Sequence, residues 1–459
     1  MVVVMESPPK SQTRLRKTLN PGLTPTALPR RQTSAGFMIL AMILFAIGGG
    51  FLGPSLVLGA GLCSWIAALL LWRRLARSQL ILVITLIGLG VTGIVIGHIS
   101  GQPLPIDRVI SRNHALLSML AAVSFLRMVT FSSLPTDQQY PKGEKSYLRT
   151  LLGLHLFGSI INISALQIIG DHLRRRGPLD LLTALLLSRG FSTCAFWSPF
   201  FGAMATSITY APNARLGVLM LTGIPLAVMG LGYTWLSARI KDTSHLQTFC
   251  GYPLQMEGLL VPLLLTSGVL GLGALQPALP TLTIITLMAL IVTLALQLYR
   301  SGIRSTWLQI NEHLTHRLPT MSGELWLFLS AGVLAVGLDQ VVVTTGLTLP
   351  IESFNATTAI GVLTAMVVAA AMGVHPIISI SALSSLLSPL SPDPTLLGII
   401  FLASWSLGVV INPLSGIHII MQSRYDIAAV KMVRQNGGYV LTLLLATAAL
   451  LQGVEYLMD

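Results

Sequence analysis

The sequence predicts an all-α membrane protein of about 11 transmembrane helices and two re-entrant hairpins, arranged as two inverted repeats with broken helices. Three observations predict this fold. The 459-residue chain is 53% hydrophobic and only 10% charged, whereas soluble domains carry roughly a quarter charged residues. Apolar runs long enough to cross a bilayer as helices recur along nearly the whole chain. Finally, two distant stretches of the chain resemble one another in the same order.

The charge balance predicts the location and some of the partners. The chain has 28 Lys and Arg against 16 Asp and Glu, a formal net charge of +12. In a soluble protein this excess would suggest nucleic acid, but here the positive charges lie in short loops between apolar runs. That pattern is typical of the positive-inside rule and of attraction to anionic lipid head groups. We therefore expect a multi-pass protein of the bacterial inner (cytoplasmic) membrane, with membrane lipids and no nucleic acid as partners.

The three cysteines indicate no metal or redox site. They lie far apart and lack the paired spacings of metal and disulfide frameworks. We expect no metal and no cofactor, apart from a coupling ion, Na+ or H+, if the protein is a transporter. A homodimer is one assembly that the sequence allows.

The N-terminal region divides into a tail and an extra helix. Residues 1–33 place Lys and Arg among Pro, Thr and Ser, which predicts a disordered basic cytoplasmic tail. A cleavable signal peptide is the alternative, but no clear small-residue cleavage site ends the apolar stretch that follows. We expect an extra transmembrane helix at 34–52, a first repeat at 53–240 and a second repeat at 254–456.

Flanking Arg and Lys residues orient the successive spans. Arg30 and Arg31 place the start of the first span inside, and Arg73 places the end of the second span inside as well, so the third runs outward. Uninterrupted spans are expected in this way at 36–51, 55–72, 80–99, 114–131, 216–236, 259–275, 282–298, 325–347 and 439–454. Interrupted spans are expected at 178–210 and 396–421, and an amphipathic helix on the inner face at 301–317.

Two further apolar runs are predicted to be re-entrant hairpins. The run 148–169 has Lys145 before it and Arg174 after it, so both of its ends favour the cytoplasm. A hairpin that enters and leaves by the same face satisfies both charges. The run 359–387 is expected to dip in from the outer face. Irregular backbone at such depth is tolerated only where protein or a water-filled cavity covers it.

The internal repeat is carried by short matches. INISAL at 161–166 matches ISISAL at 378–383, and SPFFG at 198–202 matches NPLSG at 412–416, in the same order and at a nearly constant offset. Coincidence between apolar, compositionally similar segments is the alternative. In the predicted topology the matched segments cross the membrane in opposite directions. Inverted repeats of this kind place substrate and ions near the midplane, at discontinuous helices.

These residues resemble the ion transporter superfamily, which includes divalent anion:sodium symporters, citrate transporters and arsenite-type permeases. SPFFGAMATSITYAPN followed by GIPLAVMGLG looks like the family's Gly-rich unwound segment and Gly-x-Pro helix, and SWSLGVVINPLSG looks like the equivalent Pro-containing segment. The resemblance covers roughly residues 36–455 in organisation. It implies a secondary transporter in which each repeat pairs a hairpin with a broken helix. The family positions would be taken by Gly202, Thr206, Pro212, Asn213, Gly223, Pro225, Asn412, Pro413, Ser415 and Gly416.

One departure from the family lies at the hairpin tips. The symporters carry Ser-Asn-Thr there, whereas this chain reads Asn162-Ile163-Ser164 and His375-Pro376-Ile377. Polar side chains nevertheless gather at both tips and both breaks, where backbone groups that lipid cannot satisfy must line a polar cavity. The candidate solute-binding residues at these four places are Asn162, Ser164, Ser198, Thr206, His375, Ser379, Asn412 and Ser415.

Arg189 completes the candidate set. It is expected near the bilayer centre, where charges are rare and usually functional. Its planar fork could hold an anionic group by two hydrogen bonds. The alternative is a structural Arg paired with a carbonyl or with a carboxylate such as Asp180. His375 has a structural alternative too, as a helix cap, and Ser379 could simply bond to a carbonyl of its own helix.

The sequence therefore predicts a secondary active transporter, not an enzyme, that moves a small anionic solute by alternating access with Na+ or H+ coupling. A membrane-embedded enzyme is the first alternative, but no HExxH, DxD or paired-carboxylate arrangement is found. A passive channel is the second. A channel would more naturally be a multimer around one axis, whereas this chain is expected to contain its own twofold axis.

Overall fold

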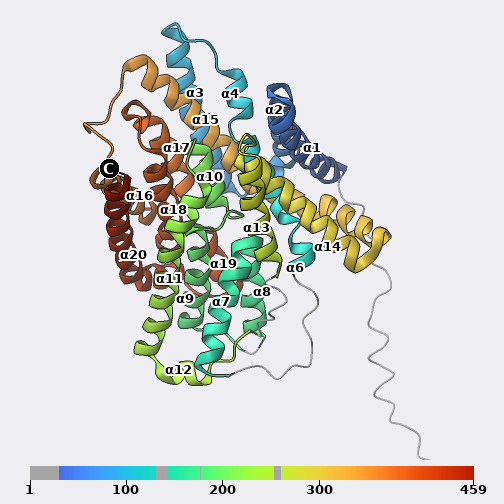
Figure 1. The fold of residues 1–459 in the computed structure, drawn as a ribbon, viewed down its shortest axis with the longest axis vertical. Coiled ribbons are helices and arrows are strands. Elements are labelled where there is room, and N and C mark those ends of the chain that lie inside the picture. Colours follow the sequence, from blue (N-terminus) through green and yellow to red (C-terminus); the bar gives the residue numbers. More distant parts are fainter. Residues whose placement is uncertain (1–29, 131–141, 176, 253–259, 459) are drawn as a thin grey trace, which may run out of the picture.

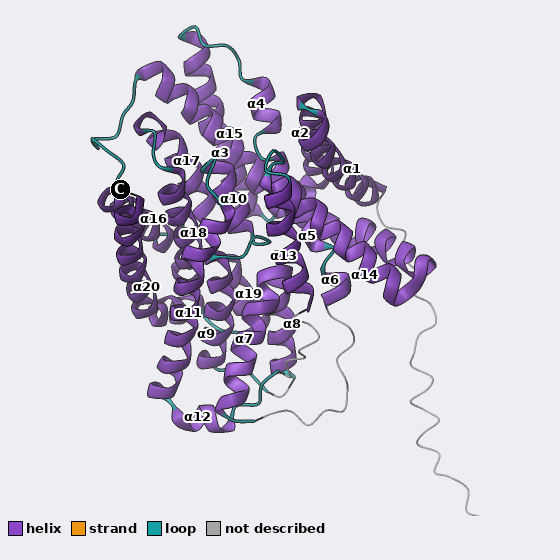
Figure 2. Cartoon of the chain, viewed as in Figure 1, coloured by secondary structure: helices purple, strands orange, loops and turns teal. Residues whose placement is uncertain are grey.

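The computed structural model describes residues 30–130, 142–175, 177–252 and 260–458, and within them the chain is all-α (Figures 1 and 2). Eight segments are long and apolar enough to cross a membrane, as expected of a multi-pass membrane protein. The predicted tail falls outside the described residues, except that 30–33 already belong to the first helix. The eight segments are Arg30–Leu52, Pro54–Arg74, Arg77–Ile99, Ile106–Val129, Leu216–Lys241, Thr281–Thr345, Pro394–Tyr425 and Ala429–Leu457.

The first two helices pack against each other, and the third packs against a helix of the second half. α1 (Arg30–Leu52) and α2 (Pro54–Leu71) pack together and are joined by Gly53 alone, whose φ of 111° favours glycine. α3 (Arg77–Ile99) follows and lies along α15 (Ser322–Thr345), from the other half of the chain (Figure 1). The short helices after α3 are α4 (Ile106–Ser111), α5 (His114–Ser124) and α6 (Arg127–Thr130).

Glycines allow α3 and α15 to touch through their backbones. A Cβ added to Gly90 would lie 2.5 Å from the carbonyl oxygen of Val333, and one added to Gly337 would lie 2.1 Å from that of Gly90. A Cβ on Gly93 would likewise lie 2.4 Å from the carbonyl oxygen of Gly337. Small residues permit this approach in membranes, where helices associate through close packing.

A two-helix hairpin and an interrupted helix follow in the first half. The hairpin consists of α7 (Glu144–Ile161) and α8 (Ile163–Arg174), which meet at Asn162 with a φ of 51°. Its ψ of −140° lies outside the left-handed helical region, so the tip has a backbone conformation that residues with a side chain rarely adopt. The next helix, α9 (Leu181–Ser192), starts at the side-chain cap Asp180 and ends in a short 3₁₀ turn, and the chain becomes helical again in α10 (Gly202–Tyr210).

The same order of elements occurs in the second half. The hairpin is α16 (Ala356–Ala371) and α17 (Pro376–Leu387), and the interrupted helix is α18 (Pro394–Ile411) followed by α19 (Gly416–Tyr425). Asp393 caps α18 by accepting hydrogen bonds from the amides of Thr395 and Leu396, as Asp180 caps α9. The remaining helices are α11 (Leu216–Lys241), α12 (Thr243–Thr248), α13 (Leu260–Leu275), α14 (Thr281–Glu312) and α20 (Ala429–Met458).

The interrupted helices form the core of the bundle. In the segment formed by α18 and α19, 83% of the most apolar 18-residue stretch is buried. In α20 the corresponding share is 22%, so α18 is central and α20 peripheral. α18 packs against α9, α10, α16 and α20 (Figure 1). A break at Gly302 (φ 70°, ψ 170°) divides α14 into two helices, so the helix expected at 301–317 is set off from the span before it, and a π-helical turn follows at His313–Arg317.

Candidate functional site

The first break is bonded to the tip of the first hairpin. Ser198 donates its hydroxyl to the carbonyl oxygen of Ser159 and accepts from the amide of Phe200 at 3.2 Å. Asn162, at the tip, donates its amide to the carbonyl oxygen of Phe200 at 3.3 Å. Ser198 is completely buried. The hairpin therefore satisfies the carbonyl of Phe200, and Ser198 satisfies the amide of Phe200, as polar backbone groups at membrane depth require.

The second break is built in the same way. Asn412 donates its side-chain amide to the carbonyl oxygen of Val374, at the tip of the second hairpin, at 3.0 Å. Its side-chain oxygen accepts from the amide of Leu414 at 2.8 Å. Asn412 thus repeats both contacts of Ser198: one to a hairpin carbonyl and one to the amide two residues later.

Hydrogen bonds also cross between the two halves. Ser406 on α18 donates to the carbonyl oxygen of Ser192 at 2.8 Å, which joins the two interrupted helices. Ser384 of the second hairpin donates to the carbonyl oxygen of Tyr210 at 2.8 Å. The matching contact in the other half is Tyr425, whose hydroxyl donates to the carbonyl oxygen of Gln167 in the first hairpin at 3.1 Å. Each hairpin is therefore bonded to the interrupted helix of the opposite half.

The remaining predicted residues are placed by their own helices. Thr206 donates its hydroxyl to the carbonyl oxygen of Gly202 within α10, and Ser415 caps α19 by accepting from the amide of His418. His375 caps α17, because its Nδ1 accepts from the amide of Ile377 at 3.3 Å. The last two predicted residues, Ser164 and Ser379, are half-buried near the hairpin tips.

Arg189 is buried and bonded to protein groups. Its exposed fraction is 2%, and its guanidinium donates to the side-chain oxygen of Asn436 at 2.8 Å, the hydroxyl of Ser237 at 3.1 Å and the carbonyl oxygen of Gln435 at 2.8 Å. The rings of Tyr233 and Tyr439 lie within cation–π distance. In this conformation the fork that was expected to hold an anion binds α11 and α20, so its role in solute binding stays a prediction.

Two histidines beside the breaks were not singled out from the sequence. His155 on α7 accepts at Nε2 from the indole of Trp197 at 3.0 Å, so its neutral ring carries the proton on Nδ1, 2.9 Å from the hydroxyl of Thr193. His418 on α19 has its Nδ1 only 2.7 Å from the carbonyl oxygen of Asn412. Each is an isolated His in an apolar run, and no motif marks it.

The breaks differ in exposure. A Cβ added to Gly202, at the start of α10, would meet Leu120 at 3.5 Å and Trp405 at 3.9 Å. A Cβ added to Gly416, at the start of α19, would meet no atom within 4 Å. The space beside the second break is therefore open, whereas side chains fill the space beside the first.

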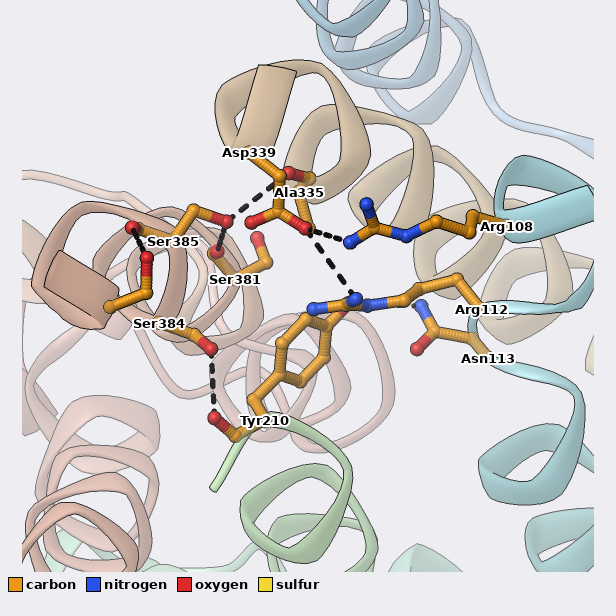
Figure 3. Close-up of polar contacts among 10 residues, drawn as sticks. Arg108, Arg112, Asn113, Tyr210, Ala335, Asp339, Ser381, Ser384 and Ser385 are labelled. Carbon is orange, nitrogen blue, oxygen red and sulfur yellow. Dashed lines mark hydrogen bonds and ion pairs between the residues drawn. The ribbon is translucent and has the colours of Figure 1, made fainter. Parts of the chain in front are cut away.

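A charged cluster lies next to the second hairpin (Figure 3). Asp339 on α15 accepts from Arg108 of α4 at 2.6 Å and lies 3.6 Å from Arg112, which follows α4. Asn113 donates to the hydroxyl of Tyr210 at 3.0 Å, and Arg112 lies over the same ring. The cluster links α4, α10 and α15 close to α17.

Within the described ranges no group of three or more His, Cys, Asp or Glu side chains could hold a metal ion. No family model and no curated protein matches the chain.

Proposed function

We propose that the chain is a secondary active transporter that moves a small anionic solute by alternating access. The single observation that carries the proposal is the pair of breaks, in which Ser198 and Asn412 make equivalent bonds to the tips of their hairpins. Discontinuous helices of this kind are the substrate sites of many transporter folds. Nothing in a purely structural bundle requires two such breaks at its centre.

The proposal includes an inverted repeat. Repeat one would span 53–240 and repeat two 254–456, with 11 crossings formed by the long helices together with the shorter and interrupted ones. Two features support it: the order hairpin, interrupted helix, long helix occurs twice, and one contact between the halves, from each hairpin to the opposite interrupted helix, occurs in both. α3 and α15 would belong to the stationary part, and the hairpins and interrupted helices to the part that carries solute.

An anion is the proposed cargo because of the helix ends at the breaks. α10 and α19 both begin there, and the start of a helix carries a positive partial charge and unsatisfied amides. Ser198, Thr206, Asn412 and Ser415, with the tip residues, would line the solute path. Arg189 would act in another conformation or only as a support.

Transport by the purified protein tests this proposal. Full-length protein in proteoliposomes is given radiolabelled succinate, citrate, sulfate and phosphate, with Na+ and H+ gradients imposed in turn. We expect one of these anions to accumulate above its outside concentration when a gradient is present. Equilibration without accumulation would support a passive channel instead, and no uptake in any condition would overturn the proposal for this class of solute.

A further inference from the structure

His418 has one ring nitrogen without a hydrogen-bond partner among the described residues. The imidazole is completely buried, and its Nδ1 must donate to the carbonyl oxygen of Asn412 because a carbonyl only accepts. The other nitrogen, Nε2, is buried, and no group in the described part of the chain forms a hydrogen bond with it. A buried polar atom without a partner costs about 1–3 kcal/mol, so such atoms are rare without a reason.

The environment of this nitrogen is the start of a helix. The bond to Asn412 holds the ring beside the first turn of α19, whose cap is Ser415. The amides of His418 and Ile419 are satisfied by Ser415, through its hydroxyl and its carbonyl. Those of Gly416 and Ile417 remain for a ligand, since the first amides of a helix have no partner inside it. A Cβ added to Gly416, in this first turn, would meet no atom within 4 Å.

A proton on Nε2 would be unfavourable here unless an anion were near. It would place a full positive charge in a buried position, next to the positive end of α19. An anion held by the free amides would lower this penalty, because opposite charges a few ångströms apart attract strongly in a poorly solvated site. Conversely, protonation of the ring would raise the affinity for the anion by the same factor as the anion raises the affinity of Nε2 for a proton, since linkage is reciprocal.

We propose that His418 takes up the coupling proton and that the solute anion, bound at the start of α19, is taken up with it. The inference rests on the proposed transport function and names its coupling ion. One proton joins Nε2, no bond to carbon forms or breaks, and the proton leaves when the anion leaves. His155 does not share this role, because both of its nitrogens have partners.

Other titratable groups near α19 do not contact His418. The elements packed against α19 are α8, α18 and α20. Their titratable residues are Asp171, His172 and Arg174 on α8 and Lys431, Arg434, Tyr439, Glu455 and Tyr456 on α20, whereas α18 has none. On α19 itself, Arg424 and Tyr425 lie at the far end, where both bond to Asp171 of α8. Within the described residues, no hydrogen bond or ion pair joins His418 to any of them.

The test measures proton movement and anion uptake together. Full-length protein is reconstituted in liposomes that contain the pH dye pyranine, and succinate, citrate, sulfate and phosphate are added outside one at a time. We expect the transported anion to acidify the interior without Na+, and its apparent affinity to rise by up to about tenfold for each unit that the outside pH falls. Protein-free liposomes correct for anions that carry their own proton.

His418→Asn is the informative variant. An Asn side chain can keep the bond to the carbonyl oxygen of Asn412 but has no titrating nitrogen, so uptake should lose its pH dependence and acidification should stop. His418→Gln, with an amide near the place of Nε2, should behave likewise. The matched control is His98→Asn: His98 is exposed, and its Nδ1 lies 3.3 Å from the carbonyl oxygen of Gln102. Both measurements should be unchanged in this variant.

Several outcomes would overturn the inference. It fails if wild-type protein moves anion without acidification, or if a folded His418→Asn keeps the wild-type pH dependence. It also fails if the folded variant binds no anion at any pH, because His418 would then be structural. If neither variant folds, the wild-type measurement still overturns the inference when anion enters without acidification. If wild-type protein moves none of the four anions, both this inference and the proposed function fall for that class of solute.

Discussion

The two breaks share a local structure but differ in their surroundings. Ser198 and Asn412 each bond to a hairpin carbonyl and to the amide two residues later. Yet Phe200, the residue that supplies this amide in the first half, is 1% exposed, whereas its counterpart Leu414 is 68% exposed. Short-range bonds therefore set the shape of a break, and neighbouring helices set whether it is open. In this conformation the second break is the open one.

Thiol labelling would test this difference most directly, with the largest expected effect. In a background without the three native cysteines, Leu414→Cys should react rapidly with a water-soluble maleimide and Phe200→Cys should not react, because side chains cover it. Labelling of both in unfolded protein is the control. Equal labelling of the folded protein would mean that the breaks exchange states freely, and no labelling of Leu414→Cys would mean that it faces lipid.

The opposite orientation of the two halves can be tested with exposed positions at the ends of the hairpins. Lys145→Cys and Arg174→Cys should be labelled from the cytoplasmic side, and Thr357→Cys and Ser388→Cys from the outer side. An impermeant reagent applied to oriented vesicles separates the two sides. If all four were labelled from one side, the repeats would not be inverted.

Arg189→Gln should cause the largest loss of stability. The variant leaves the side-chain oxygen of Asn436 and the carbonyl of Gln435 without their charged donor, which we expect to lower the free energy of unfolding by about 3 kcal/mol. Arg189→Lys keeps the charge but not the fork, so transport should fall while folding persists. Thermal unfolding in detergent and uptake measure the two effects. Normal uptake by Arg189→Gln would restrict this residue to a structural role.

Equivalent substitutions at the two breaks should lower the free energy of unfolding by different amounts. Ser198→Ala strands a buried carbonyl and a buried amide, and we expect it to cost about 2 kcal/mol. Asn412→Ala strands the same kinds of group at the open break, where water can replace the lost bond, so about 1 kcal/mol is expected. Both should weaken apparent solute affinity in the uptake assay. A response in only one half would contradict a solute site shared by the repeats.

The smallest effect is expected at the far end of α19. Asp171 on the first hairpin pairs with Arg424 in a bidentate contact, but both side chains are substantially exposed. Ser384 and Tyr210 make the corresponding link in the other half without an ion pair. Asp171→Asn should therefore change the free energy of unfolding by about 0.5 kcal/mol or less, and by less still in high salt. Chemical denaturation at two salt concentrations measures this; a larger change would show that the pair secures the hairpin.

Local features could be predicted from the sequence better than long-range pairs. SPFFG and NPLSG marked both breaks, and the charges around 148–169 indicated the place of the first hairpin. The partners of Arg189 on α11 and α20 could not be predicted, because they lie far from it along the chain. Helical periodicity relates only residues within the same helix. His418 was missed for a similar reason: only the fold shows that its Nδ1 is bonded and its Nε2 is not. The break at Gly302 lies at the start of the helix expected at 301–317, where the apolar run ends and the amphipathic pattern begins.

The contact between α3 and α15 has a mechanical consequence. Where Gly90 and Gly337 meet, the two backbones touch with no side chain between them. No side chains are therefore present there that could change rotamer and let one helix slide along the other. We therefore expect α3 and α15 to move together as one rigid pair. Because this pair takes one helix from each half, it connects the two halves rigidly. If the hairpins move during a transport cycle, we expect them to move relative to this pair.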